Sequence, residues 1–189
     1  MLGKLFETYG SDKHVNGYTP VYESLFLGLR PRALLEVGIG TMIPNAHSSM
    51  VGFAGPNYQP GGSLRAWRDY FELAEIHGID VQPDTQFVET RIKTHICNST
   101  VQEHVRDTLG QMKFDIIIDD GSHAANDQIQ TMKNLLPYLS DDGIYVIEDI
   151  HPGSYINTHP EAVAEMFPET MQYLVGKELN QMVVRKRCH

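Results

Sequence analysis

Short apolar runs recur along this chain, and the segments between them carry apolar residues at helical spacing. Most of the runs are rich in β-branched side chains and end at a polar residue or a glycine. Such runs are typical of strands that are buried on both faces of a parallel sheet. The pattern predicts five of these strands, at Ala33–Val37, Glu75–Val81, Ile92–Cys97, Phe114–Asp119 and Ile144–Glu148.

The segments between the strands predict helices. Thr19-Pro20 combines a hydroxyl cap with a proline in the first turn, so a helix is expected from there to about Arg30. Ser63 is expected to cap the helix that contains Trp67, whose spacing relative to its apolar neighbours places it in the core. Further helices are expected after Ser99 or Thr100 and over the apolar stripe Ile129, Met132, Leu136 and Leu139.

The alternation of helices and strands predicts an α/β fold with a mostly parallel sheet and helices on both faces. Met171–Val175 and Gln181–Arg187 predict an antiparallel hairpin at the C-terminal edge of that sheet. A length of 189 residues suits one domain, so residues 1–189 are expected to form a single unit. Residues 43–61 form a loop that is too long for an ordinary strand-to-helix turn, and we expect it to be an active-site loop.

Composition excludes several classes of partner. The net charge of −9 argues against nucleic acid, because phosphate contacts need a basic surface. No apolar stretch approaches the length of a membrane span, and the first residues lack the pattern of a signal peptide. Cys97 and Cys188 lie far apart and indicate a reducing compartment, so a cytoplasmic location without membrane contact is expected.

Two acidic clusters follow two of the predicted strands. Asp119-Asp120-Gly121-Ser122-His123 follows one, and Glu148-Asp149 follows the next. Ligands bind at the carboxyl ends of the strands in open α/β sheets, so both clusters are expected at the ligand-binding edge. Carboxylates gathered there would repel each other unless a hard divalent cation binds between them. His123 is then placed to move a proton, although ordinary capping and solvated loop positions remain the alternative interpretation.

A second group of residues indicates a nucleoside site at the same edge. Glu36-Val37-Gly38-Ile39-Gly40 ends the first strand, where glycine lets the backbone approach a ligand. A dinucleotide fingerprint would place a third glycine at the start of the helix, which this chain lacks, so a nucleoside without phosphates fits better. Asp80 can accept hydrogen bonds from ribose hydroxyls, and Asn98-Ser99 can contact a base. A merely tight turn at Gly38 and a helix-capping role for Ser99 are the alternatives.

Together these motifs resemble the class I S-adenosylmethionine-dependent methyltransferases, which have a Rossmann-like sheet. Three further segments, together with the two acidic clusters, indicate a narrower family within this class. These segments are Tyr9–Lys13, Gly17–Tyr22 and Gly62–Trp67. With these segments the chain is similar to the metal-dependent sugar O-methyltransferases of macrolide-antibiotic biosynthesis. The resemblance covers nearly the whole chain; its acidic motifs are specific, whereas its glycine motif is generic.

The resemblance implies a role for each motif. It implies that Asp120, Glu148 and Asp149 hold Mg²⁺ and that His123 is the general base that deprotonates a substrate hydroxyl. Residues 1–30 would supply a lid segment and a helix, and the loop before Gly61 would close over the site. The acceptor would be a small molecule, a sugar or glycoside, and self-association is suggested by relatives. Contacts to S-adenosylmethionine would come from Glu36, Gly38, Gly40, Asp80, Asn98, Ser99 and Asp119.

Other functions remain open from the residues alone. A catechol-like acceptor would use the same metal chemistry. A nicotinamide-dependent oxidoreductase would use a similar sheet, but the third glycine and a Tyr-x-x-x-Lys pair are missing. A non-catalytic module that binds nucleoside and metal is a third interpretation. A nucleic-acid methyltransferase is disfavoured by the acidic charge, and Asn98 stands where the resembled family usually carries an acid.

Overall fold

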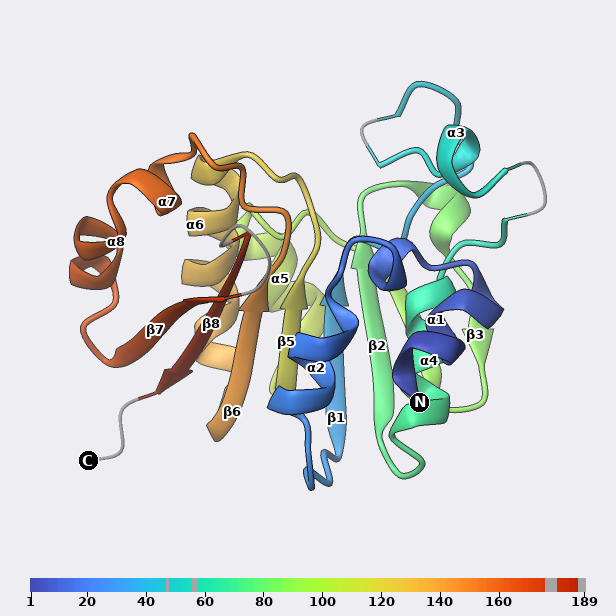
Figure 1. Cartoon of the computed structure of the whole chain (residues 1–189), viewed down its shortest axis with the longest axis horizontal. Helices are drawn as coiled ribbons and strands as arrows, with labels where there is room; N and C mark the ends of the chain where they lie inside the picture. Colours follow the sequence, from blue (N-terminus) through green and yellow to red (C-terminus); the bar gives the residue numbers. More distant parts are fainter. Residues whose placement is uncertain (47, 56–57, 176–179, 187–189) are drawn as a thin grey trace.

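The computed structural model describes residues 1–46, 48–55, 58–175 and 180–186 of the chain. Its centre is an eight-stranded sheet with the order β3-β4-β2-β1-β5-β6-β8-β7 (Figure 1). The five strands from β4 to β6 in this order pair in parallel, whereas β3, β8 and β7 pair antiparallel to their neighbours. The strands are β1 Ala33–Val37, β2 Glu75–Asp80, β3 Val88–Glu89, β4 Ile92–Ile96, β5 Phe114–Asp119, β6 Leu139–Ile147, β7 Thr170–Val175 and β8 Gln181–Lys186.

Helices cover both faces of the sheet (Figure 1). On one face, α1, α2 and α4 pack Phe6, Tyr22 and Trp67 against the sheet. On the other face, α5 and α6 pack Val105 and Met132 against it, and α7 and α8 continue that layer. The helices are α1 Leu2–Tyr9, α2 Thr19–Leu25, α3 Val51–Ala54, α4 Gly62–Tyr70, α5 Gln102–Leu109, α6 Ala125–Leu135, α7 Tyr155–Thr158 and α8 Pro160–Met166, with 3₁₀ turns at Asp12–His14, Pro83–Thr85 and Leu136–Tyr138.

The predicted α/β class, the mostly parallel sheet and the C-terminal hairpin are confirmed. Arg187, the last residue of the predicted hairpin, lies outside the described residues. Trp67 is fully buried, as its spacing predicted, and its ring packs edge-on against Phe6 and Tyr22. Within the described residues, no helix is both long and apolar enough to cross a lipid bilayer.

Several element boundaries differ from the prediction. Helix α2 ends at Leu25 instead of Arg30, because Gly28 adopts a left-handed conformation that interrupts the helix before Pro31. Leu139 was predicted on a helix but begins β6, because Pro137 lies in the 3₁₀ turn Leu136–Tyr138 and cannot continue α6. The short helix α3 lies within the predicted loop at residues 43–61, of which residues 47 and 56–57 lie outside the described residues.

The strand order places a crossover point beside β1. The chain proceeds from β1 outward through β2 and β4, and then returns to add β5 and β6 on the other side of β1. Loops that leave β1 and β5 in opposite directions open a crevice at the carboxyl ends of these strands, which is the usual ligand site of such sheets. Gly38 and Asp120 follow the last residues of β1 and β5 and lie at this crevice.

Candidate active site

The glycine turn after β1 brings two loops into direct backbone contact. Gly38 has a φ of 88°, and a Cβ at this position would lie 2.0 Å from the carbonyl oxygen of Asp120. No other residue fits this position without moving the β5 loop. The turn is further fixed by Asp80, whose Oδ2 accepts the backbone N–H of Ile39 at 2.8 Å and whose Oδ1 accepts that of Gln82 at 2.9 Å.

Three neighbouring cavities lie along the carboxyl ends of the strands. The first, which we call the Asp80 cavity, is also lined by Asn98, Ser99, Gly38 and Gly121. The second, the Lys13 cavity, shares Gly38 and Gly121 with the first and adds Gly40. Both cavities therefore meet at Gly38 and Gly121, which stand at the start of the loops after β1 and β5.

The third cavity opens beyond His123. It is lined by Ala124, Ile150, Pro152 and Asn180, and we call it the Ile150 cavity. His123 and Asp149 line both the Lys13 cavity and the Ile150 cavity, so these two side chains stand at the boundary between them. A ligand in one cavity can therefore meet a ligand in the other at His123.

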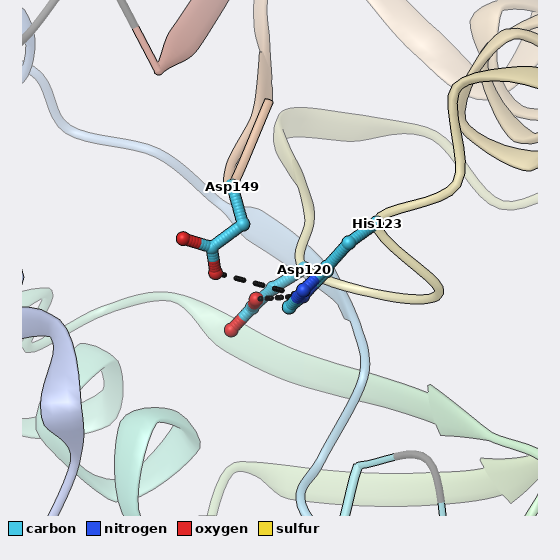
Figure 2. Close-up of side chains that lie close together, drawn as sticks. All are labelled: Asp120, His123 and Asp149. Carbon is cyan, nitrogen blue, oxygen red and sulfur yellow. Dashed lines mark hydrogen bonds and ion pairs between the residues drawn. The ribbon is translucent and has the colours of Figure 1, made fainter. Parts of the chain in front are cut away.

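His123 lies between two carboxylates (Figure 2). Its Nε2 is 3.3 Å from Asp120 Oδ1 and 3.5 Å from Asp149 Oδ2. The hydrogen bond with Asp120 raises the pKa of His123, and the charge of Asp149 adds to this effect. His123 and Asp149 both have a positive φ, of 50° and 51°. Non-glycine residues rarely adopt this conformation, and such strain is concentrated at functional sites.

Lys13 enters the acidic cluster from the N-terminal segment. It is 1% exposed, and its Nζ lies 2.7 Å from Asp120 Oδ2 and 3.1 Å from Glu36 Oε1, with Glu148 as its third partner. Burial alone would lower the pKa of Lys13, but the three carboxylates raise it well above its usual value. Burial would raise the pKa of Asp120, but the charge of Lys13 and the bond with His123 lower it to about 2. Asp120 is therefore a carboxylate at neutral pH.

A divalent cation fits the outer part of this cluster. Ligand atoms of Asp120, His123 and Asp149 lie within 4.8 Å of one another. Four carboxylates meet here, from Glu36, Asp120, Glu148 and Asp149, and Lys13 is the ammonium ion that contacts three of them. The cluster keeps an excess of negative charge, and carboxylate oxygens suit hard cations such as Mg²⁺.

Glu148 differs from the other two predicted metal ligands. It is fully buried, and its Oε1 and Oε2 accept hydrogen bonds from Tyr22 and Lys13 respectively. Burial raises the pKa of Glu148 well above its usual value, although Lys13 opposes this shift. The structure does not bring Glu148 into the group formed by Asp120, His123 and Asp149, so a direct metal contact from Glu148 stays a prediction.

Two predicted cofactor residues lie outside the three cavities. Glu36 is fully buried, and its Oε2 accepts the indole N–H of Trp67 at 2.9 Å while Oε1 faces Lys13. Asp119 is also buried, and its Oδ1 accepts the backbone N–H of Gly121 at 3.3 Å. Burial raises the pKa of Asp119 to about 7. Both residues support the cavity walls in this structure, because neither carboxylate reaches a cavity surface.

The remaining predicted cofactor residues lie along the first two cavities. Asn98 and Ser99 line the Asp80 cavity, but both are also engaged locally. Asn98 Oδ1 accepts hydrogen bonds from the backbone and hydroxyl of Thr100, and Ser99 Oγ lies 2.9 Å from the hydroxyl of Thr131. The predicted capping of α5 by Ser99 or Thr100 is wrong, because Val101 precedes its first turn.

Three side chains of the N-terminal segment reach the site although their roles were not predicted from the sequence. Lys13, Tyr18 and Tyr22 are buried, and they contact Asp120, Asp149 and Glu148 respectively. The motifs Tyr9–Lys13 and Gly17–Tyr22 were noticed, but apolar and aromatic positions in a short segment do not reveal which side chain reaches a site 107 to 131 residues later.

Comparison with known proteins gives the same family as the sequence motifs. Residues 60–150 match a protein family described as a methyltransferase domain. A Streptomyces olivaceus protein, 8-demethyl-8-(2-methoxy-alpha-L-rhamnosyl)-tetracenomycin-C 3'-O-methyltransferase, is 37% identical over 154 residues, which are 79% of this chain and 36% of that protein. Mycinamicin VI 2''-O-methyltransferase of Micromonospora griseorubida is 31% identical over 155 residues, again 79% of this chain and 36% of the relative. The chain thus spans little more than a third of the length of these relatives.

A solved structure confirms the fold. The MycE methyltransferase from the mycinamycin biosynthetic pathway, in complex with Mg, SAH and mycinamycin VI, superposes with a TM-score of 0.78 at 23% identity. The match covers 98% of this chain and 54% of that one. The Rossmann-like arrangement predicted from the sequence is therefore confirmed, and the resemblance to sugar O-methyltransferases is confirmed by the curated relatives.

Proposed function

Because this chain carries a methyltransferase domain related to that of sugar O-methyltransferases, we propose that it transfers a methyl group from S-adenosylmethionine to a hydroxyl of a sugar or glycosylated small molecule. The observation that carries the proposal is the position of His123, which borders the Lys13 cavity on one side and the Ile150 cavity on the other. A methyl donor and a hydroxyl acceptor in these cavities would meet at a group that can accept a proton.

The cofactor is assigned to the Asp80 and Lys13 cavities. Asp80 is held at the end of β2, where a carboxylate can accept hydrogen bonds from ribose hydroxyls. Each of its oxygens already accepts one backbone N–H but retains a second lone pair for a ligand. Gly38 lines both cavities and Gly40 lines the Lys13 cavity, so both are assigned to the cofactor, and Asn98 and Ser99 are assigned to the base.

A divalent cation, Mg²⁺ by the hardness of its ligands, is assigned to Asp120 and Asp149. When bound, the cation would lower the pKa of the acceptor hydroxyl and hold it in place. His123 accepts the proton of that hydroxyl, since its Nε2 lies at the boundary between the cavities. Methyl transfer then requires the acceptor oxygen to lie in line with the C–S bond of the cofactor. The walls of the two cavities would orient donor and acceptor in this way.

The acceptor is assigned to the Ile150 cavity. Its lining of Ala124, Ile150 and Pro152 offers apolar surface beside the polar boundary residues. A sugar presents hydroxyls along its edge and C–H groups on its face, which matches this mixture. The names of the relatives describe methylation of sugar hydroxyls on glycosylated polyketides and macrolides, which supports a glycoside as the substrate class for this chain.

The proposal is tested with radiolabelled S-adenosylmethionine and a panel of rhamnosides and macrolide glycosides. Transfer of label that stops with EDTA and returns with Mg²⁺ is expected. Asp120→Asn should abolish this metal-dependent transfer and retain cofactor binding, because its carboxamide is a weaker cation ligand and Asp120 holds the cation rather than the nucleoside. Cofactor and metal binding without transfer to any glycoside or catechol would instead favour a non-catalytic module.

A further inference from the structure

We propose that Tyr18 is a positioning residue whose hydroxyl orients the carboxylate of Asp149 for a divalent cation, and that cation binding is thereby coupled to docking of residues 11–22. This inference rests on the proposed function in one respect, because it takes Asp149 as a cation ligand. It concerns a side chain that does not itself line any of the three cavities.

The hydroxyl of Tyr18 uses all of its hydrogen-bonding capacity. It donates to Asp149 Oδ1, and it accepts the backbone N–H of Asp149 at 3.3 Å and the side-chain N–H of Asn180 at 3.1 Å. A phenol has one hydrogen to donate and two lone pairs to accept with. Since the other two partners are donors, the hydrogen of Tyr18 is directed to Asp149. Tyr18 is 1% exposed, so no water competes for this bond.

Asp149 needs such support. Its φ of 51° is strained for a residue with a Cβ, and a strained backbone persists only where surrounding contacts fix it. Tyr18 bonds both the backbone N–H and the side chain of Asp149, so a single aromatic ring fixes the conformation and the carboxylate together.

The two carboxylate oxygens of Asp149 contact different residues. Oδ1 faces Tyr18, whereas Oδ2 faces His123 at 3.5 Å. Asp120 is arranged in the same way, since Oδ2 accepts from Lys13 at 2.7 Å and Oδ1 faces His123 at 3.3 Å. Each carboxylate is thus fixed through one oxygen by the N-terminal segment, and its other oxygen faces His123, where the ligand atoms that could hold a cation lie within 4.8 Å of one another.

Coupling follows from this shared use of the carboxylates. Removing a residue that hydrogen-bonds a metal ligand typically lowers metal affinity by about 10- to 100-fold. If the docked segment strengthens cation binding, the cation must stabilise the docked segment by the same factor. The segment between Ser11 and Tyr22 should therefore open less often when the cation is bound.

The first test is calorimetric titration of the whole chain with MgCl₂, comparing Tyr18→Phe with Tyr9→Phe. Both substitutions remove a tyrosine hydroxyl from the N-terminal segment, but the Tyr9 hydroxyl bonds Asp69 and Arg68 on α4, away from the acidic cluster. Tyr18→Phe is expected to weaken Mg²⁺ binding at least tenfold, and Tyr9→Phe is expected to bind like the parent. Equal or tighter binding by Tyr18→Phe would overturn the inference.

The second test is hydrogen exchange of residues 11–22 with and without Mg²⁺. Slower exchange with Mg²⁺ is expected in the parent and in Tyr9→Phe, and a smaller difference is expected in Tyr18→Phe. A Mg²⁺ effect of the same size in all three proteins would show that Tyr18 has a purely structural role and overturn the coupling. If the parent binds no divalent cation at all, the metal assignment of the proposed function fails with it; if the parent binds Mg²⁺ and Tyr18→Phe binds it equally, only this inference fails.

Discussion

Lys13→Met should destabilise the protein far more than an ordinary lysine substitution. Lys13 places three ammonium N–H groups among the carboxylates of Glu36, Asp120 and Glu148, and only 1% of the residue is exposed. Methionine fills a similar volume but leaves the three carboxylates without their cation. Removing one partner from a buried ion pair typically costs about 3–5 kcal/mol, because the remaining charge is left uncompensated.

The loss of folding stability in Lys13→Met should depend on pH. Burial raises the pKa of Glu36 and Glu148 in the folded parent and Lys13 opposes both shifts, so without Lys13 both pKa values should rise further above those of the unfolded chain. The folded variant then binds more protons than the unfolded one, so its stability falls as the pH rises above about 4. The difference from the parent is expected to be largest near pH 8 and smallest near pH 5.

Urea unfolding followed by circular dichroism tests this prediction, because it gives the free energy of unfolding of each variant. Lys93→Met is the matched control, because Lys93 lies 3.7 Å from Glu75 in an exposed pair that is worth at most about 1 kcal/mol. Lys13→Met with Glu148→Gln in the same chain should regain part of the loss, since one buried charge is removed. A Lys13→Met variant that loses no more stability than Lys93→Met would refute the role given to this cluster.

Three further predictions address the turn, the base and a histidine pair. Gly38→Ala should abolish S-adenosylmethionine binding, because its Cβ would lie 2.0 Å from the carbonyl oxygen of Asp120; parental affinity in calorimetry would contradict the geometry of the crevice. His123→Ala should lower turnover by about 10²- to 10⁴-fold and remove one ionisation from the pH–rate profile; an unchanged profile would mean that another group is the base. Burial and the neighbouring His95 lower the pKa of His77 to about 4, so the folded state favours its neutral form. The parent should therefore lose up to about 3 kcal/mol more stability than His77→Leu as the pH falls from 6.5 to 4, and equal losses in urea unfolding would contradict this.

The parallel part of the fold could be predicted because its central strands contain short buried apolar runs. All five predicted strands overlap β1, β2, β4, β5 and β6. The signal is strongest in β5 and β6, where Ile116–Ile118 and Ile144–Ile147 are buried apolar runs, whereas β4 has polar residues between its two isoleucines. The shortest helices and strands have no recognisable apolar pattern in the sequence. The two-residue strand β3 and the four-residue helices α3 and α7 are held by tertiary contacts rather than by their own periodicity.

The site could be predicted only in part for a related reason. Asp80 is the last residue of β2, and Gly38, Asp120 and Asp149 lie just after strands, and the end of a parallel strand fixes where a residue lies in space. Glu36 also lies on a strand, but alternation directs its side chain to the helix layer, where Trp67 and Lys13 bind it. The contacts of Lys13 and Tyr18 depend on how an N-terminal segment folds back over the sheet, and local patterns do not contain that information.

Calorimetric titration with S-adenosylmethionine, with and without Mg²⁺ and with NAD as a comparison, tests the central claim most directly. We expect that the methionine cofactor binds, that NAD does not, and that cofactor binding survives in Asp120→Asn. Binding of NAD in its place, or no binding of S-adenosylmethionine under either condition, would contradict the assignment of the Asp80 and Lys13 cavities to the methyl donor.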